Sequence, residues 1–391
     1  MTKAARATEN VVLFLFLGLV SLPSEENPEL TFRALWVVRG SMTSPAEIDR
    51  SLRFAKENGF NHLFVQVRGR GDAFYNSQVV PKARPIRESN FDPLDYAVRK
   101  GHELGLSIHA WLNVYLIWSS EWLPEIDTHI LNRYPEWVDR SFFGETTSHV
   151  GKELNNYQTG NEQFLSPAHP EVVNRLVNIF REVIANYDID GLHLDYVRYS
   201  DADFGYTGAA RRDFQKEYRV DPVELVKETG PDSNPVSPGR RQFLLRRWVQ
   251  YRRDRVTALL RKCNALILDL DPQCILSVAV KPGPNEARDR YYQEWDRWLA
   301  EGLVDYVVPM NYTPDLRLFA RNIDEIYESI PTKYWPGIVM GIAVYNQDAL
   351  DARDKVRYAK VTGFSGISIF SYDAHKNDPD FFRPIVDEIN R

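Results

Sequence analysis

The chain has 391 residues, of which 43% are hydrophobic and 26% are charged, and its formal net charge is −6 at pH 7. This ordinary globular composition excludes a disordered, collagen-like or coiled-coil chain, and the acidic balance gives no reason to expect nucleic acid or an anionic membrane as a partner. The two cysteines, Cys263 and Cys274, exclude a disulfide scaffold and a cysteine zinc site, and whether they pair is left open. We expect no metal and no cofactor.

The N-terminus has the pattern of a secretory signal. Lys3 and Arg6 precede an apolar run at residues 11–20, and small and turn residues follow it. This order is typical of a signal peptide, and a run of about ten residues is too short to span a bilayer. We therefore expect residues 1–24 to be a signal peptide and residues 25–391 to be one exported domain without a membrane segment, periplasmic, secreted or on the cell surface. A buried N-terminal helix is the alternative.

From residue 30 onward, short apolar runs alternate with stretches of helical period. Ser44 and Asp92 stand where the caps of the first two helices are expected, each with a proline in the first turn. The predicted strands are residues 31–38, 62–67, 106–112, 189–194, 274–280, 304–310, 337–344 and 366–370. The predicted helices include residues 45–58, 91–105, 170–187, 240–270, 291–302, 316–330, 347–362 and 379–391.

Eight strands, each followed by a helix, predict an α/β fold of the (β/α)₈ or TIM-barrel class. Two long stretches interrupt the alternation, residues 113–166 after the third strand and residues 200–239 after the fourth. In such a barrel both insertions leave from the C-terminal face, where enzymes of this architecture build their clefts. We therefore expect them to form the walls of an open cleft.

Polar residues gather at the predicted carboxyl ends of the strands, which is where barrels carry their function. Period-two alternation places His193 and Asp195 on the inner face, and gives Gln66 and Arg68 a common face. Each residue alone also has a structural interpretation, such as a core role for His109, but packing explains so many polar strand ends less well. The candidate substrate-binding residues are Arg39, Gln66, Arg68, His109, Trp111, Asn113, His193, Tyr196, Arg198, Lys281, Asn311 and Tyr312.

Asp195 is the leading catalytic candidate. Flanked by Tyr196 and Arg198 at an inward strand end, it is expected to stay ionised and could attack an anomeric carbon or stabilise an oxocarbenium-like charge. A glycosidase of this kind needs a second carboxyl group about 5–5.5 Å away for retention or about 6.5–9.5 Å away for inversion. We rank Asp72 first and Asp373 second for this role, and a loop glutamate third, from Glu145, Glu153 and Glu162.

Aromatic content supports a sugar ligand, because the chain holds 9 Trp, 20 Tyr and 20 Phe. Aromatic faces stack on the C–H faces of pyranose rings, although apolar cores absorb most such residues. In the insertion after the third strand, Trp118, Trp122 and Trp137 are candidate sugar platforms, and local packing explains each of them equally well.

Several long strings resemble one known family. They are FRALWVV (Phe32–Val38), FNHLFVQVRGRGDAFY (Phe60–Tyr75), FDPLDYAVRKGHELGLSIHAWLN (Phe91–Asn113), YDIDGLHLDYVRY (Tyr187–Tyr199) and GISIFSYD (Gly366–Asp373). Through them the sequence resembles the glycosyl-hydrolase-like family 10, formerly a domain of unknown function. That group includes a divisome-associated bacterial enzyme that cleaves denuded peptidoglycan strands.

The resemblance implies a (β/α)₈ barrel and an exported glycoside hydrolase of a poly- or oligosaccharide, with peptidoglycan glycan strands as a candidate substrate. A catalytically silent glycan-binding barrel that acts as a scaffold is the alternative. A metal-dependent hydrolase would need a His-x-His at the end of the first strand, where Val37, Val38 and Arg39 stand instead.

A more distant similarity is to the family 18 chitinases, whose fourth strand carries DGxDxDxE. In this frame the sequence keeps Asp190 and Asp195, but Val197 occupies the position of the chitinase general acid. Valine cannot donate a proton, so another group has to serve as the acid.

Overall fold

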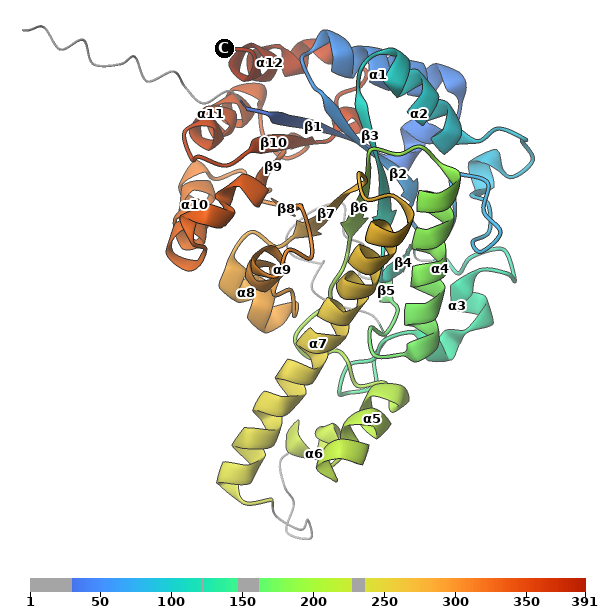
Figure 1. The fold of residues 1–391 in the computed structure, drawn as a ribbon, viewed down its shortest axis with the longest axis vertical. Coiled ribbons are helices and arrows are strands. Elements are labelled where there is room, and N and C mark those ends of the chain that lie inside the picture. The colour runs from blue at the N-terminus through green and yellow to red at the C-terminus, as the bar shows by residue number, and fades with distance from the viewer. Residues whose placement is uncertain (1–29, 121, 147–161, 227–235) are drawn as a thin grey trace, which may run out of the picture.

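The computed structural model describes residues 30–120, 122–146, 162–226 and 236–391 (Figure 1). The expected signal peptide, residues 1–24, lies outside the described residues. Within the described ranges, no helix combines the length and the apolar character that crossing a membrane requires.

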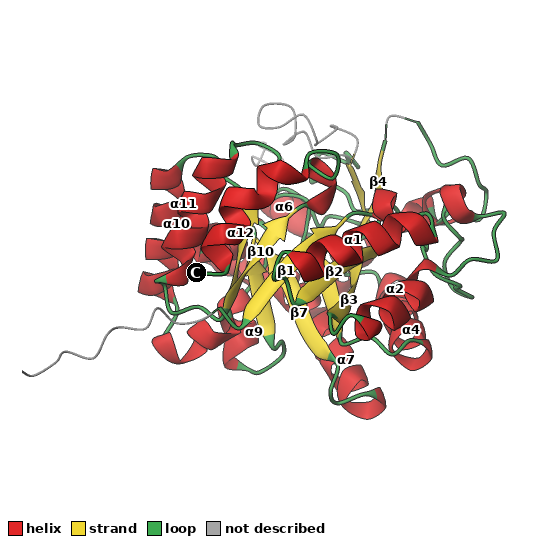
Figure 2. Cartoon of the chain, turned by 90° about the horizontal axis from the view of Figure 1, so that it is seen from above, coloured by secondary structure: helices red, strands yellow, loops and turns green. Residues whose placement is uncertain are grey.

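The centre of the molecule is a barrel of eight parallel strands, surrounded by helices (Figures 1 and 2). The strands follow the order β8-β7-β6-β3-β2-β1-β10-β9, and isolated parallel bridges from Val307 to Ile338 and from Met310 to Gly341 join β8 to β9. The (β/α)₈ prediction is therefore confirmed. The barrel strands are β1 (Phe32–Val37), β2 (His62–Arg68), β3 (Ser107–Asn113), β6 (Gly191–Asp195), β7 (Ile275–Val280), β8 (Tyr306–Pro309), β9 (Val339–Ala343) and β10 (Gly366–Phe370).

The helices begin where their caps predict. The Ser44 side chain accepts a hydrogen bond from the backbone of Glu47 in the first turn of α1, and Asp92 caps α2 in the same way. The helices that cover the strands are α1 (Pro45–Glu57), α2 (Pro93–Glu103), α4 (Pro170–Asn186), α7 (Pro238–Leu270), α8 (Pro284–Arg290), α9 (Trp295–Ala300), α10 (Leu316–Ser329), α11 (Ala349–Lys360) and α12 (Arg383–Ile389).

The strands separate two apolar layers. Their outward side chains pack against the helices in the main core, whereas inward aromatic residues, including Trp36, Phe64 and Trp111, fill the barrel in a second cluster. Trp36 meets Phe64 at 4.9 Å and Trp111 at 4.7 Å between ring centroids. Because the interior is packed with side chains, a ligand can be bound only at the barrel mouth.

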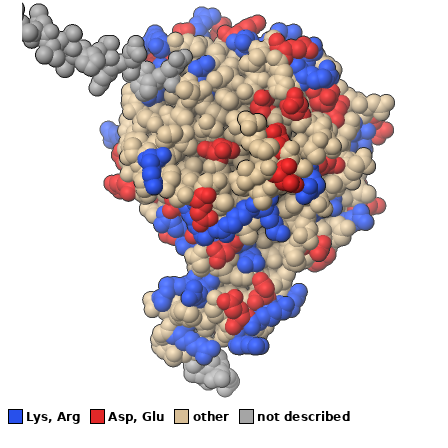
Figure 3. Space-filling model, viewed as in Figure 1, with Lys and Arg blue, Asp and Glu red and all other residues tan. Residues whose placement is uncertain are grey.

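The two long insertions leave from the carboxyl ends of β3 and β6. The first forms an antiparallel pair, β4 (Leu116–Ser119) and β5 (Glu162–Phe164), and a short helix, α3 (Ile130–Arg133). The second forms α5 (Gly208–Tyr218) and α6 (Pro222–Val226), which pack against the N-terminal half of α7 where that helix projects beyond the barrel (Figure 1). Basic and acidic side chains are interspersed over this projection (Figure 3).

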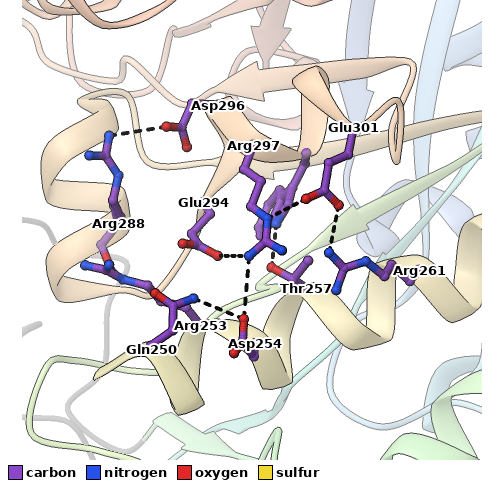
Figure 4. Close-up of polar contacts among 11 residues, drawn as sticks. Gln250, Arg253, Asp254, Thr257, Arg261, Arg288, Glu294, Asp296, Arg297 and Glu301 are labelled. Atoms are coloured by element: carbon purple, nitrogen blue, oxygen red, sulfur yellow. Dashed lines mark hydrogen bonds and ion pairs between the residues drawn. The ribbon is translucent and has the colours of Figure 1, made fainter. Parts of the chain in front are cut away.

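The barrel half of α7 is fastened to α9 by polar contacts (Figure 4). Arg297 of α9 lies 3.5 Å from Asp254 of α7, Glu301 after α9 lies 2.7 Å from Arg261 of α7, and the Trp298 indole donates to Thr257 at 2.9 Å. Partly exposed ion pairs contribute little singly, so the buried Trp298 contact is the stronger anchor. These contacts fix the helix that follows the second insertion.

A close approach between β1 and β10 makes Gly366 a sensitive position. Phe32 and Gly366 are partners in the strand pairing, and a Cβ at residue 366 would overlap the Phe32 carbonyl oxygen. We expect Gly366→Ala to lower the free energy of unfolding by about 3 kcal/mol or more, because backbone atoms of both strands must move.

The matched control is Gly239→Ala in α7, where an added Cβ would meet no atom within 4 Å. Its stability should stay within about 1 kcal/mol of the unchanged protein. Denaturant unfolding followed by circular dichroism measures both, and equal stability of the two variants would contradict the close approach.

Candidate active site

Asp195 ends β6 beside Asn113 of β3, on the inner face as the alternation predicts, with 5% of its surface exposed. Its Oδ1 accepts a 2.6 Å hydrogen bond from the backbone N–H of Tyr196, whose φ of 54° lies in the left-handed region. Strained backbone of this kind is concentrated at functional sites.

Burial raises the pKa of Asp195 to about 6, and it outweighs the opposing effects of the Tyr196 N–H, of Arg198 and of Lys281. The Trp111 indole also favours the ionised form. The sequence predicted an acid that stays ionised, whereas the buried carboxyl group is mainly ionised only above about pH 6. Desolvation at the barrel mouth, which the sequence does not report, causes the difference.

Two cations lie near this carboxyl group, the buried Arg198 and the half-buried Lys281. The Arg198 guanidinium lies over three rings, 5.3 Å from Phe164, 5.0 Å from Tyr196 and 5.0 Å from Tyr291, and its Nε has no hydrogen-bond partner. The Lys281 Nζ lies 4.6 Å from the centre of the Tyr291 ring. Burial, together with the positive charge of Arg198, lowers the pKa of Lys281 to about 8. Aromatic rings thus hold both cations near the carboxyl group.

Glu162 brings a second carboxyl group to the same place. It lies on β5, where the pairing with Ser119 of β4 fixes its position. The positive charges of Arg198 and Lys281 act on Glu162 as they act on Asp195, and burial raises the pKa of Glu162 against them. The Tyr196 hydroxyl is influenced by both carboxylates. The two acids therefore share one pair of cations and one tyrosine.

The other loop glutamates have different surroundings. Glu153 lies outside the described residues. Glu145 is exposed, and its backbone N–H and C=O both bond to Ser141 in a turn. Of the three loop candidates, Glu162 is therefore the one whose described position lies near the cations that also act on Asp195.

Asp72 and Asp373 both follow barrel strands, but their hydrogen bonds are to other groups than the cations that Glu162 shares with Asp195. Asp373 accepts hydrogen bonds from the Val38 N–H at 2.6 Å and the Ser41 hydroxyl at 2.7 Å, so both of its oxygens tie the segment after β10 to the end of β1. These contacts favour a structural role. Asp72 is half-buried in the turn after β2, where its Oδ1 accepts from the Arg70 N–H at 2.9 Å.

A chain of hydrogen bonds crosses the ends of β1, β2 and β3 toward Asp195. Arg39 donates through its backbone N–H at 3.3 Å and its side chain at 3.4 Å to the Gln66 carbonyl oxygen. The Asn113 side-chain oxygen, Oδ1, accepts hydrogen bonds from the Gln66 amide at 3.4 Å and from the Trp111 indole at 3.1 Å. Gln66 and Asn113 are 3% and 4% exposed, so their amides orient neighbouring groups rather than offer free contacts to a substrate.

The prediction that Arg68 shares the inner face with Gln66 is wrong. A bulge between these residues shifts the register, so that Arg68 pairs with Leu112, whose side chain belongs to the outer core. Arg68 is 1% exposed and donates to the backbone carbonyls of Asn113 and Val114. It therefore fastens the strand ends and does not face the mouth.

Two histidines predicted to bind substrate are core residues instead. His109 and His193 are both 0% exposed and lie inside the barrel, where His193 is one layer of side chains below Asp195 and His109 is two layers below. Hydrogen bonds join His109 to His62 at 2.9 Å and His193 to Ser277 at 2.8 Å. Alternation predicted their inward direction correctly, but it could not distinguish the filled interior from the mouth.

Asn311 and Tyr312 follow β8 and have different surroundings. Asn311 is 1% exposed, and its amide bonds to the Phe319 carbonyl and to Asn322 of α10, which corrects its prediction as a substrate contact. The Tyr312 hydroxyl is buried without a hydrogen-bond partner, and its pKa is raised by burial and by the charge of Asp195. Tyr312 therefore remains at the site.

The sequence could not show that Glu162, Phe164 and Tyr291 lie together around Arg198. The strand of Glu162, β5, has three residues, too few to show a period, and it ends at Phe164, 27 residues before β6 begins at Gly191. Phe164 and Tyr291 each contribute a ring to the Arg198 environment, and neither stands at a barrel strand end.

The chain matches the family described as glycosyl hydrolase-like 10 over residues 32–355. It is 24% identical over 340 residues to the glycosyl hydrolase DigH of Escherichia coli K12, covering 78% of this chain and 67% of DigH. It is also 24% identical over 339 residues to the glycosyl hydrolase YngK of Bacillus subtilis 168, covering 77% of this chain and 58% of YngK. The alignments thus leave a third or more of each relative unmatched.

Solved structures share the fold. The glycoside hydrolase domain of PgaB (BpsB) from Bordetella bronchiseptica superposes with a TM-score of 0.66 at 14% identity, covering 91% of this chain and 98% of that domain. The catalytic domain of a beta-amylase from Paenibacillus polymyxa superposes with a TM-score of 0.58 at 12% identity, covering 92% of this chain and 97% of that domain. At such identities the likeness establishes the barrel architecture alone.

The shared cations predict how Asp195 titrates. Its pKa of about 6 should be visible by carbon-13 NMR of the carboxyl group, assigned by comparison with Asp195→Asn. Lys281→Met removes a positive charge that favours the carboxylate, so the pKa of Asp195 should rise. Exposed Lys333, changed to Met, is the control and should leave the titration unchanged. An unaltered midpoint in Lys281→Met would show that the cation does not act on Asp195.

Proposed function

Because the chain belongs to the glycosyl hydrolase-like 10 family, we propose that it hydrolyses a glycosidic bond in a poly- or oligosaccharide. In this proposal Asp195 is the nucleophile, or it stabilises the developing charge and takes a proton from the attacking water, and Glu162 is the general acid. The observation that carries the proposal is the pair of carboxyl groups held around Arg198 and Lys281 at the mouth of the barrel.

The two carboxyl groups are suited to different roles. Asp195 receives N–H donors, including the Tyr196 backbone, and such donors favour a carboxylate. The side-chain carboxyl group of Glu162 forms no hydrogen bond or ion pair with the described residues, and burial raises its pKa, so it can carry a proton. Environments that separate two carboxyl groups in this way underlie acid and base assignments in glycosidases.

In the proposed reaction, Glu162 gives its proton to the glycosidic oxygen as the bond from that oxygen to the anomeric carbon breaks. Asp195 then either forms a bond to that carbon, which water later breaks, or accepts a proton from water that attacks directly. The oxygen–oxygen separation in the complex with substrate selects between these two courses. The Arg198 and Lys281 charges keep Asp195 available as the anion.

We also propose that the protein is exported and that its substrate is a cell-wall glycan, with peptidoglycan strands first among the candidates. The N-terminal pattern of residues 1–24 and the resemblance to the family support this reading. A barrel that binds glycans without cleaving them is the competing function, and the two carboxyl groups at the mouth favour the enzyme.

The test is incubation with denuded glycan strands and a polysaccharide panel, followed by analysis of released oligosaccharides. Asp195→Asn should abolish release while the fold is kept, since the loss of several kcal/mol of stabilisation slows turnover by about a thousandfold or more. Asp188→Asn is the control, because Asp188 lies just before β6 with its side chain 96% exposed. Near-normal turnover in Asp195→Asn would remove Asp195 from the mechanism.

Glu162→Gln should slow cleavage of the natural glycan about a hundredfold or more, the usual contribution of a general acid. An aryl glycoside whose leaving group needs no proton should be cleaved almost normally by the same variant. If Glu162→Gln leaves both rates unchanged and Asp72→Asn lowers them, the acid is Asp72. If no member of the panel is cleaved by the unchanged protein, the glycan-binding scaffold is the better account.

A further inference from the structure

A cavity of about 380 Å³ opens beside Arg39, which follows β1, and Trp118 of β4. It lies between the turn after β2, the segment that leads to α2 and the end of β4. Five basic side chains and two carboxylates, Asp72 and Glu125, line it together with the rings of Trp118 and Trp122. Although the whole chain carries a net negative charge, this cavity has an excess of positive charge.

Arg39 and Arg70 are the cations that matter most. The pKa of Arg39 is lowered by burial and then by the positive charge of Arg70, and Asp72 offsets this in part. Neither arginine forms an ion pair in the described part of the chain, whereas Arg84 at the rim is paired with Glu125 at 2.8 Å. Two like charges held together beside a cavity are costly, and an anion bound between them would offset the cost.

The aromatic rings narrow the chemistry of that anion. The Trp118 indole donates to the Trp122 carbonyl at 2.7 Å, and the Arg70 guanidinium lies 5.8 Å from the Trp118 ring. Trp122 is 79% exposed, which is unusual for so large an apolar side chain. An inorganic anion needs only the arginines, whereas a sugar with a carboxylate offers a C–H face to the rings and a planar acid to the guanidinium groups.

Arg39 connects this cavity to the reaction centre. Its charge acts on the Tyr196 hydroxyl, which is also influenced by Asp195 and Glu162. Gly69 leaves the space that the Arg39 side chain occupies, because a Cβ there would stand 2.7 Å from an Arg39 nitrogen. A glycan that passes between the two carboxyl groups could therefore extend into the cavity.

We propose that the cavity is a binding subsite for an acidic sugar residue of the glycan, one that carries a free carboxylate. The inference rests on the proposed function, because it assigns the chemical class of substrate to the same cleft. In this proposal Arg39 and Arg70 select for the carboxylate, and the exposed Trp122 ring stacks on the sugar.

The experiment measures binding without turnover, on the Asp195→Asn protein, by isothermal titration calorimetry. The probes are denuded glycan-strand fragments and a hexamer of galacturonic acid, each compared with its own carboxyl-amidated form. At least one acidic probe should bind about tenfold or more tightly than its amidated counterpart, the usual value of a charge-assisted contact, and this preference should shrink as salt is raised. Equal affinity of acidic and amidated forms for both probes, or no binding of either probe, overturns the proposal.

Two further variants in the same background separate the roles. Arg70→Gln should reduce binding of the acidic probe to the level of the amidated one, with an unchanged melting temperature. Trp122→Ala, at an exposed position, should weaken acidic and amidated probes alike. Arg317→Gln on α10, exposed and away from the cavity, is the matched control. If Arg70→Gln keeps the full preference for the acidic form, the subsite is not in this cavity.

Inorganic phosphate is the competitor that tests for a plain anion site. Displacement of the acidic probe by phosphate at equal concentration would mean that the sugar ring adds nothing, which contradicts the proposal. Charge-selective binding without hydrolysis of any glycan by the unchanged protein would overturn the proposed function and leave the subsite. Hydrolysis of a glycan without charge-selective binding would support the proposed function and overturn the subsite.

Discussion

The site depends on how the buried Asp195 side chain can stay ionised near neutral pH in a barrel whose interior is filled with aromatic rings. Burial alone would favour the protonated form of Asp195, and the cost of an isolated buried charge is large. The Tyr196 N–H and two cations offset this cost without a direct ion pair, because Arg198 and Lys281 are held on aromatic rings rather than on the carboxyl group. The carboxylate thus stays available for chemistry.

The packed interior explains why function is confined to one end. Rings of Trp36, Phe64 and Trp111 fill the barrel, and His109 and His193 each form one hydrogen bond within it. The layer that contains Asp195 and Asn113 lies at the ends of β6 and β3, from which the two insertions leave. The first insertion then supplies what the strands lack, a second acid on β5 and the aromatic wall of the cationic cavity.

The comparisons and the site contribute different kinds of support. The family match and the likeness to solved barrels establish ancestry and architecture, and a fold of this kind hosts many activities. The chemistry has to be argued from Asp195, Glu162 and the cations around them. The cavity lined by Arg39 and Arg70 is likewise a property of this chain, read from the residues that face one another there.

The sequence by itself determined the barrel, since apolar periodicity and helix caps such as Ser44 are local signals that survive without tertiary contacts. It also determined that Asp195 faces inward at a strand end, because side chains alternate along a strand. Only the tertiary structure decided the bulge that turned Arg68 outward, the burial that raised the pKa of Asp195, and the meeting of Glu162 with Lys281. These depend on register, on desolvation and on contacts between distant segments, which are set by how the whole chain packs rather than by any local pattern of residues.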